Sequence, residues 1–160
     1  RRTQTRNVVA YTDAGYTVMA ADLLGTGESA CPPALTMTVA MIGERPLGII
    51  VAQIIALARW AAGGRRKRPV RVSSKGTVTA FATLCAAAIE PDLFGHMLLE
   101  GMKDSLKRMI DLPVAYEDAV PLFCFGLLRE VDVPELFALC GNLEIEWGGH
   151  GPVFPVGRGI

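Results

Sequence analysis

Two long segments of this chain carry almost no charge. Leu47 to Ala62 is interrupted by only one glutamine and one arginine, and Thr77 to Ile89 contains no charged residue at all. Pro46 precedes the first segment and Gly63 follows it, the pattern of a helix start and a helix end. Because a helix that is apolar on nearly all sides belongs in an interior, the sequence predicts two core helices that other elements must cover.

Short apolar runs with β-branched residues stand between the helical segments and are predicted as strands: Tyr16 to Ala21, Pro69 to Ser73, His96 to Glu100 and Asn142 to Trp147. Further helices are predicted at Arg2 to Ala14, Lys103 to Ile110, Val120 to Leu128 and directly after Asp132. Strands separated by segments of helical length run parallel through crossover connections. We therefore predict one α/β domain over residues 1–160, with a mostly parallel sheet flanked by helices in a three-layer α/β/α arrangement.

The last of these helices has the clearest start signal. Asp132 is followed by Val133, Pro134 and Glu135. An acidic residue at the N-cap, an early proline and a glutamate three residues on are typical of a capping box. The sequence predicts that Asp132 caps this helix.

The balance of charge argues against a protein that binds nucleic acid or membranes. The chain has 160 residues, with 16 Lys or Arg, 16 Asp or Glu and 51% hydrophobic residues. A net charge of zero gives no long-range attraction to nucleic acid or to an anionic membrane. The longest apolar stretch falls short of the roughly 20 residues that cross a bilayer, and Arg1 to Val8 lacks the apolar core of a secretion signal. We expect a soluble, cytoplasmic protein that binds neither nucleic acid nor membrane.

The four cysteines favour a reducing compartment. Cys31, Cys85, Cys124 and Cys140 are widely spaced, without a Cys-x-x-Cys pair or a Cys/His group of zinc-site spacing. Buried free thiols are the expected state, and neither a disulfide framework nor a metal site is predicted.

Two other groups of residues are interpreted as structural. Arg65 to Arg68 is a basic run between a helix and a strand, expected to be a solvated loop rather than a localisation signal or a phosphate site. Phe123 and Phe125 lack the interleaved basic residues that nucleic-acid stacking requires. We expect these two rings to pack in the core.

The most informative segment is Gly15 to Ser29, GYTVMAADLLGTGES. It resembles the pattern G-Y-x-V-x-x-x-D-x-x-G-x-G-x-S of α/β-hydrolase proteins, a buried strand and sharp turn at the fourth strand of their sheet. Gly25 to Ala30 also matches a dinucleotide-binding fingerprint, but that fingerprint needs a helix to start at its glycines. Pro32 and Pro33 argue against such a helix, so Asp22 to Leu35 is predicted to be a loop and no cofactor is expected.

Val72 to Gly76 is a strand-to-helix junction, where this family places its nucleophile elbow, G-x-S-x-G. Position for position, the resemblance makes Ser74 the nucleophile and Lys75 the donor of a backbone N–H to the oxyanion hole. The first residue of the pattern is valine here instead of glycine. The alternative interpretation is that Ser73 and Ser74 only cap the following helix.

A serine nucleophile needs a base and an orienting acid, which follow it in the order acid, histidine in this family. His150 comes after Ser74 in that order. Either Glu146 or Asp132 is then the acid. The alternative places His150 in a tail without a catalytic role. His96 has no counterpart in the pattern and is expected to be structural or on the surface.

The resemblance continues through Arg45 to Gly48, Ala86 to Phe94 and Val131 to Leu136, and it looks like the acetyl-xylan-esterase-like and dienelactone-hydrolase-like branch. It implies a carboxylic ester hydrolase of the acetyl esterase type, acting on a small-molecule ester. The chain then corresponds to the central part of a hydrolase or to a diverged relative that no longer catalyses. The competing hypothesis is a non-catalytic α/β domain that binds a partner through the edge of its sheet.

In the family's sheet, one strand lies between the two that correspond to Tyr16 to Ala21 and Pro69 to Ser73. These two strands must therefore pair directly, or another chain must fill the gap. The high apolar share of the chain predicts association, either with a second copy of itself or with the missing hydrolase segments.

Overall fold

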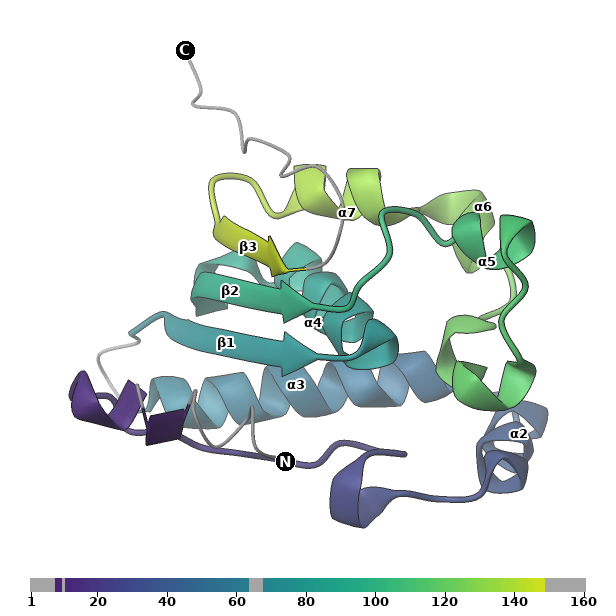
Figure 1. Ribbon diagram of the computed structural model, residues 1–160, viewed down its shortest axis with the longest axis horizontal. Coiled ribbons are helices and arrows are strands. Elements are labelled where there is room, and N and C mark those ends of the chain that lie inside the picture. The colour runs from purple at the N-terminus through teal and green to yellow at the C-terminus, as the bar shows by residue number, and fades with distance from the viewer. Residues whose placement is uncertain (1–7, 10, 64–67, 149–160) are drawn as a thin grey trace.

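The computed structural model describes residues 8–9, 11–63 and 68–148. At its centre is a three-stranded sheet in the order β1 (Val70–Lys75), β2 (Phe94–Glu100), β3 (Glu144–Gly148). Both neighbouring pairs are parallel, and the three arrows in Figure 1 point the same way. The predicted fold class is confirmed: a parallel sheet flanked by helices, consistent with part of a three-layer α/β/α fold.

The register of the strands sorts their side chains onto two faces. Successive residues of a strand point to opposite sides, and residues paired across parallel strands point to the same side. Met97 pairs with Ile145 on the face that packs on the helices, whereas Leu98 pairs with Glu146 on the opposite face. The helix face consists of Val70, Val72, Ser74, Met97, Leu99, Ile145 and Trp147; the open face consists of Arg71, Ser73, Lys75, His96, Leu98, Glu100, Glu144 and Glu146.

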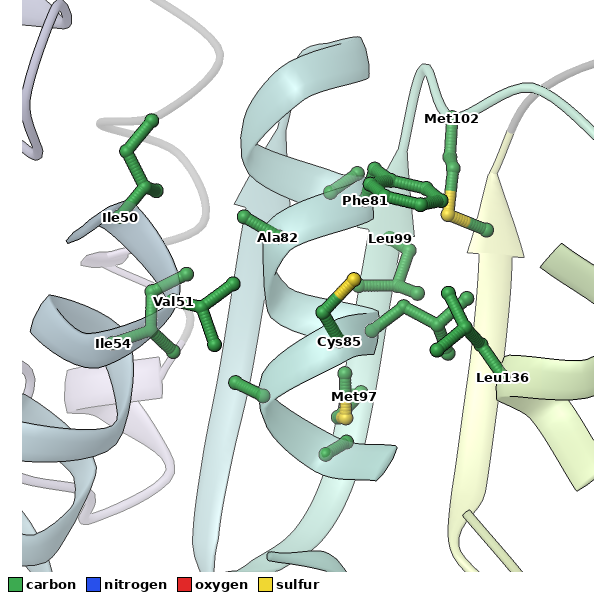
Figure 2. Close-up of a cluster of buried hydrophobic side chains, with 14 of the residues drawn as sticks. Ile50, Val51, Ile54, Phe81, Ala82, Cys85, Met97, Leu99, Met102 and Leu136 are labelled. Atoms are coloured by element: carbon green, nitrogen blue, oxygen red, sulfur yellow. The ribbon is translucent and has the colours of Figure 1, made fainter. Parts of the chain in front are cut away.

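Three helices lie against the helix face: α3 (Pro46–Ala62), α4 (Thr77–Ile89) and α7 (Val133–Leu139). The helix α4 contacts β1 and β2, with α3 on one side of it and α7 on the other (Figure 2). The sequence predicted α3 and α4 to within one residue of these bounds. It also predicted the start of α7, where Asp132 and Glu135 form a capping box.

The core lies between these helices and the sheet. Ile50 of α3, Phe81 of α4 and Leu99 of β2 are each at most 1% exposed. Ala82 and Ala86 of α4 are fully buried, and their small side chains allow α4 to approach its neighbours closely. Figure 2 shows this cluster, with Ile50, Val51 and Ile54 on one side of α4 and Met102 and Leu136 on the other.

The predicted strand Tyr16 to Ala21 is wrong. These residues form no strand and only Val18 is half-buried, so the run has neither a pairing partner nor an apolar contact face among the described residues. The Tyr16 ring instead lies under the guanidinium of Arg71, 5.3 Å from ring centroid to Cζ. Residues 8–9 and 11–13, just before it, are helical, as predicted for the end of Arg2 to Ala14.

The predicted loop Asp22 to Leu35 is correct only in part. It contains a short 3-10 helix, η1 (Gly27–Ser29), and its last residues belong to α2 (Pro33–Met41). Pro33 starts this helix instead of preventing it, because the first helical position needs no N–H partner. Leu24 anchors the loop to α3 by donating its amide to Oε1 of Gln53, at 3.0 Å.

The segment after β2 is less helical than predicted. In place of two helices it has short turns of helix: α5 (Arg108–Asp111), η3 (Tyr116–Asp118), η4 (Val120–Leu122) and α6 (Leu127–Glu130). Gly126, at φ +81°, separates the last two. A further 3-10 turn, η2 (Pro91–Leu93), precedes β2. Phe123 and Phe125 are 47% and 90% exposed, so the prediction that they pack in the core is wrong.

None of the helices in the described part of the chain is by itself long and apolar enough to cross a membrane. The helices α2 and α3 meet that criterion jointly by length and composition, but they are bent by 98° relative to each other.

Candidate active site

Ser74 lies inside β1, where it pairs with Leu99 of β2 and faces the helices. A nucleophile elbow requires the serine to stand on a sharp, strained turn after the strand. Among the described residues no residue other than glycine has a positive φ, so Ser74 does not occupy such a turn. Its Oγ is buried and has no hydrogen-bond partner in the described structure. The hydroxyl is therefore held in the layer between sheet and helices.

The sharp turn at this junction is made by Gly76. It has φ +106° and is the N-cap of α4, and no side chain caps that helix. The alternative prediction, that Ser73 and Ser74 cap α4, is therefore wrong. The Gly76 amide donates to the carbonyl of Glu100 at 2.8 Å, and the Thr77 hydroxyl donates to the carbonyl of Gly101 at 2.9 Å. The ends of β1 and β2 are tied together directly.

Lys75 is the last residue of β1, and its side chain is exposed on the open face, opposite Glu100. The backbone of Lys75 belongs to the strand, since the turn begins one residue later. The predicted oxyanion donor is thus the last residue of the β1 ladder, and the turn follows it at Gly76.

Glu146, one of the two candidate acids, lies on the other side of the sheet from Ser74. It pairs with Leu98 on the open face, whereas Ser74 pairs with Leu99 on the helix face. The Glu146 carboxylate meets His96 instead, at 3.0 Å between Oε1 and Nε2. The structure therefore separates Glu146 from Ser74 by the thickness of the sheet.

The carboxylate of Asp132, the other candidate acid, already accepts hydrogen bonds from two backbone amides and one hydroxyl. The donors are the Leu106 amide and the Val133 amide, both at 2.8 Å, and the Ser105 hydroxyl. Burial raises the pKa of this carboxyl, but these hydrogen bonds and the nearby Lys107 outweigh it, so the pKa of Asp132 lies below its usual value. This carboxylate caps α7 and fixes the loop after β2.

His150, the predicted base, lies outside the described residues. In the sequence it comes two residues after Gly148, where β3 ends. The described part of the chain brings neither a histidine nor a carboxylate into hydrogen-bond contact with Ser74.

No family model, curated protein or solved structure matches this chain. The α/β-hydrolase relationship therefore stays a prediction from the sequence.

An apolar cavity of about 140 Å³ lies in the segment after β2, among α5, η4 and α6. Its lining is almost wholly aliphatic or aromatic, and comprises Leu106, Met109, Ile110, Leu122, Phe123, Cys124, Leu127 and Leu128. Figure 1 shows that this segment lies beyond the carboxyl ends of the strands. The cavity offers apolar contact and no charged group.

One group of side chains with metal-ligating atoms was not predicted from the sequence. His96 of β2 and Glu144 and Glu146 of β3 come together on the open face. The available signal was the spacing of the two glutamates, two positions apart within a predicted strand, because that spacing places both on one face. The sequence alone did not show that His96 lies beside them.

Proposed function

We propose that this chain is a non-catalytic α/β domain that binds an extended acidic segment of a partner protein along the edge of β1. The observation that carries the proposal is the place of β1 at the end of the sheet. One of its edges pairs with β2, and no strand in the described part of the chain pairs with the other. Such an edge presents N–H and C=O groups that an added strand can satisfy.

The side chains of β1 favour an acidic partner. Arg71 and Lys75 are exposed on its open face, with Ser73 between them. Two copies of β1 pairing antiparallel about Ser73 would place basic side chains opposite basic side chains, which destabilises a strand pair. A segment with Glu or Asp at alternate positions would instead meet these residues with opposite charge. Charge complementarity therefore favours a different protein over a second copy of this chain.

The position of Ser74 supports a non-catalytic role. Its hydroxyl lies within the strand, buried and without a partner in the described structure, and Glu146 lies on the opposite face. A serine nucleophile needs a base within hydrogen-bond reach and an acid that orients that base.

Hydrolysis of p-nitrophenyl acetate by wild type, Ser74→Ala and the matched variant Ser73→Ala tests the absence of catalysis. We expect all three proteins to release p-nitrophenol at the same rate, indistinguishable from buffer. A wild-type rate above buffer that falls in Ser74→Ala but not in Ser73→Ala would overturn the non-catalytic proposal.

Fluorescence anisotropy with a labelled peptide of alternating Val and Glu tests binding at the edge. We expect the double variant Arg71→Glu/Lys75→Glu to bind about tenfold more weakly than wild type, because like charges now face each other. Arg129→Glu, a charge reversal on α6, is the matched control and should bind as wild type does. Failure of the peptide to bind wild type, or equal binding by the double variant, would contradict the proposal.

Ester hydrolysis is the second candidate function, favoured by the sequence order of Ser74 and His150, which is the order that the family resemblance requires. The ends of β1 and β3 lie at the same edge of a parallel sheet, with only β2 between them. In that mechanism Ser74 attacks the carbonyl of a small-molecule ester while the Lys75 amide stabilises the oxyanion; the ester C–O bond breaks, His150 passes the serine proton to the departing alcohol, and water then releases the acyl group from Ser74. The p-nitrophenyl acetate assay, extended to His150→Gln, separates it from the first proposal.

A further inference from the structure

Three side chains of metal-ligating type meet on the open face of the sheet. His96 of β2 pairs with Glu144 of β3, and Glu146 follows two residues later on the same face. One ligand atom from each of the three lies within 4.8 Å of the other two, and His96 Nε2 lies 3.0 Å from Glu146 Oε1. The group is separate from Ser74, which faces the helices.

We propose that His96, Glu144 and Glu146 bind a divalent transition-metal ion such as Zn²⁺. One imidazole nitrogen and two carboxylate oxygens form a three-ligand set that leaves a coordination position for water or another ligand. An imidazole ligand favours zinc and its neighbours over Ca²⁺ and Mg²⁺, which prefer all-oxygen ligand sets. The chemistry of the donors therefore selects the class of ion.

The strand ladder holds this ligand set in place before any ion arrives. All three residues stand on two paired strands, so their Cα positions are fixed by the register. The His96 side chain is only 13% exposed, whereas that of Glu146 is 63% exposed. The imidazole is thus the more buried ligand, and the two glutamates lie on the exposed side of the group.

The charges on the open face favour a cation at the β3 side. Glu144 and Glu146 are like-charged neighbours, and no ion pair in the described structure neutralises Glu144. Arg71 pairs with His96 from the other side, but its guanidinium lies over the Tyr16 ring, 5.3 Å from the centroid. A bound cation would relieve the repulsion between the two carboxylates.

Isothermal titration of the full chain with ZnCl₂ tests the proposal, with Glu100→Gln as the matched control. Glu100 lies on the same face of β2 but outside the group. We expect one ion per chain, binding about tenfold or more weaker in His96→Gln and in Glu144→Gln, and unchanged binding in Glu100→Gln. Thermal unfolding of each apo variant checks that the loss of binding is not a loss of fold.

Two further measurements test whether His150 or a cysteine binds the ion instead. The His150→Gln variant removes the second histidine of the chain and should bind Zn²⁺ as wild type does. The spectrum of the Co²⁺ complex should lack a thiolate charge-transfer band, because no cysteine belongs to the group. The proposal is overturned if folded His96→Gln and Glu144→Gln bind as tightly as wild type, if wild type binds no ion, or if His150 or a thiol proves to be the ligand.

Discussion

The carboxylate of Asp132 accepts a hydrogen bond from the amide of Leu106 at 2.8 Å, across 26 residues of sequence. The same carboxylate accepts the amide of Val133 at the start of α7. One buried side chain therefore starts a helix and also fixes the loop that leaves β2. Removing it leaves the buried Leu106 amide without its partner.

We expect Asp132→Ala to lower the free energy of unfolding by about 2 kcal/mol at pH 7, the sum expected for a lost cap and a stranded donor. The pKa of Asp132 is lower in the folded protein than in the unfolded chain. The ionised carboxylate therefore stabilises the fold at pH values above the unfolded pKa of about 4, and this stabilisation is lost as the pH falls through the lower pKa of the folded state. Urea unfolding of wild type and Asp132→Ala from pH 7 to pH 3 measures this difference in the free energy of unfolding. The difference should shrink on acidification, whereas the exposed Asp92→Ala should show little difference at any pH. A difference for Asp132→Ala that stays constant with pH would contradict the assignment.

Two glycines of the chain should respond oppositely to alanine. Gly101 has φ +81° and lies against Gly76, so that a Cβ added to Gly101 would stand 3.6 Å from the Gly76 Cα. Because a side chain is strained at this φ, we expect Gly101→Ala to destabilise the protein by about 1 kcal/mol or more. Gly48 lies within α3, with an ordinary contact to Arg45 and no positive φ. Gly48→Ala should stabilise by about 0.5–1 kcal/mol, and thermal unfolding that ranks the two in the other order would refute this explanation.

The elements that local sequence determines were predicted well. The bounds of α3 and α4 follow from their apolar composition and their flanking proline and glycine, and Asp132 carries its capping signal within four residues. Tyr16 to Ala21 has the composition of a strand but forms none, because a strand also needs a neighbour with which to pair. Pairing is a property of the whole sheet, and a single run does not encode it.

The candidate sites depend on register, which the sequence did not supply. Ser74 was predicted at a turn, yet the ladder with β2 continues to Lys75 and moves the turn to Gly76. Because the strand continues past Ser74, the serine hydroxyl is buried between the sheet and the helices. The same register places His96 beside Glu144, a contact between residues far apart in sequence. A one-residue change in register would have moved every side chain to the other face.

Ser74→Ala should stabilise the fold. The Ser74 Oγ is buried and has no partner in the described structure, so its hydroxyl loses water without gaining a hydrogen bond. Removing it should raise the free energy of unfolding by about 1 kcal/mol. Ser73→Ala, on the exposed face of the same strand, should have little effect. Urea unfolding at pH 7 compares the two, and a clear destabilisation by Ser74→Ala alone would indicate a partner for this hydroxyl.

The four cysteines should differ in their reactivity. All four are free; Cys85 and Cys140 are buried, whereas Cys31 and Cys124 are half-buried. Burial, with smaller effects of Cys140 and Cys124, raises the pKa of the Cys85 thiol to about 12, and burial raises the pKa of Cys140 to about 11. Since the thiolate is the form that alkylates, these two should react far more slowly than Cys31 with iodoacetamide at pH 8.

Peptide mass spectrometry after timed alkylation measures this difference, and the same reaction in urea is its control. In urea the protection of Cys85 and Cys140 should vanish, because unfolding returns both thiols to water and to an ordinary pKa. Native Cys85 reacting as fast as Cys31 would mean that α4 opens readily. The alkylation rate of Cys85 therefore reports how tightly α4 is held between α3 and α7, where it packs on the sheet.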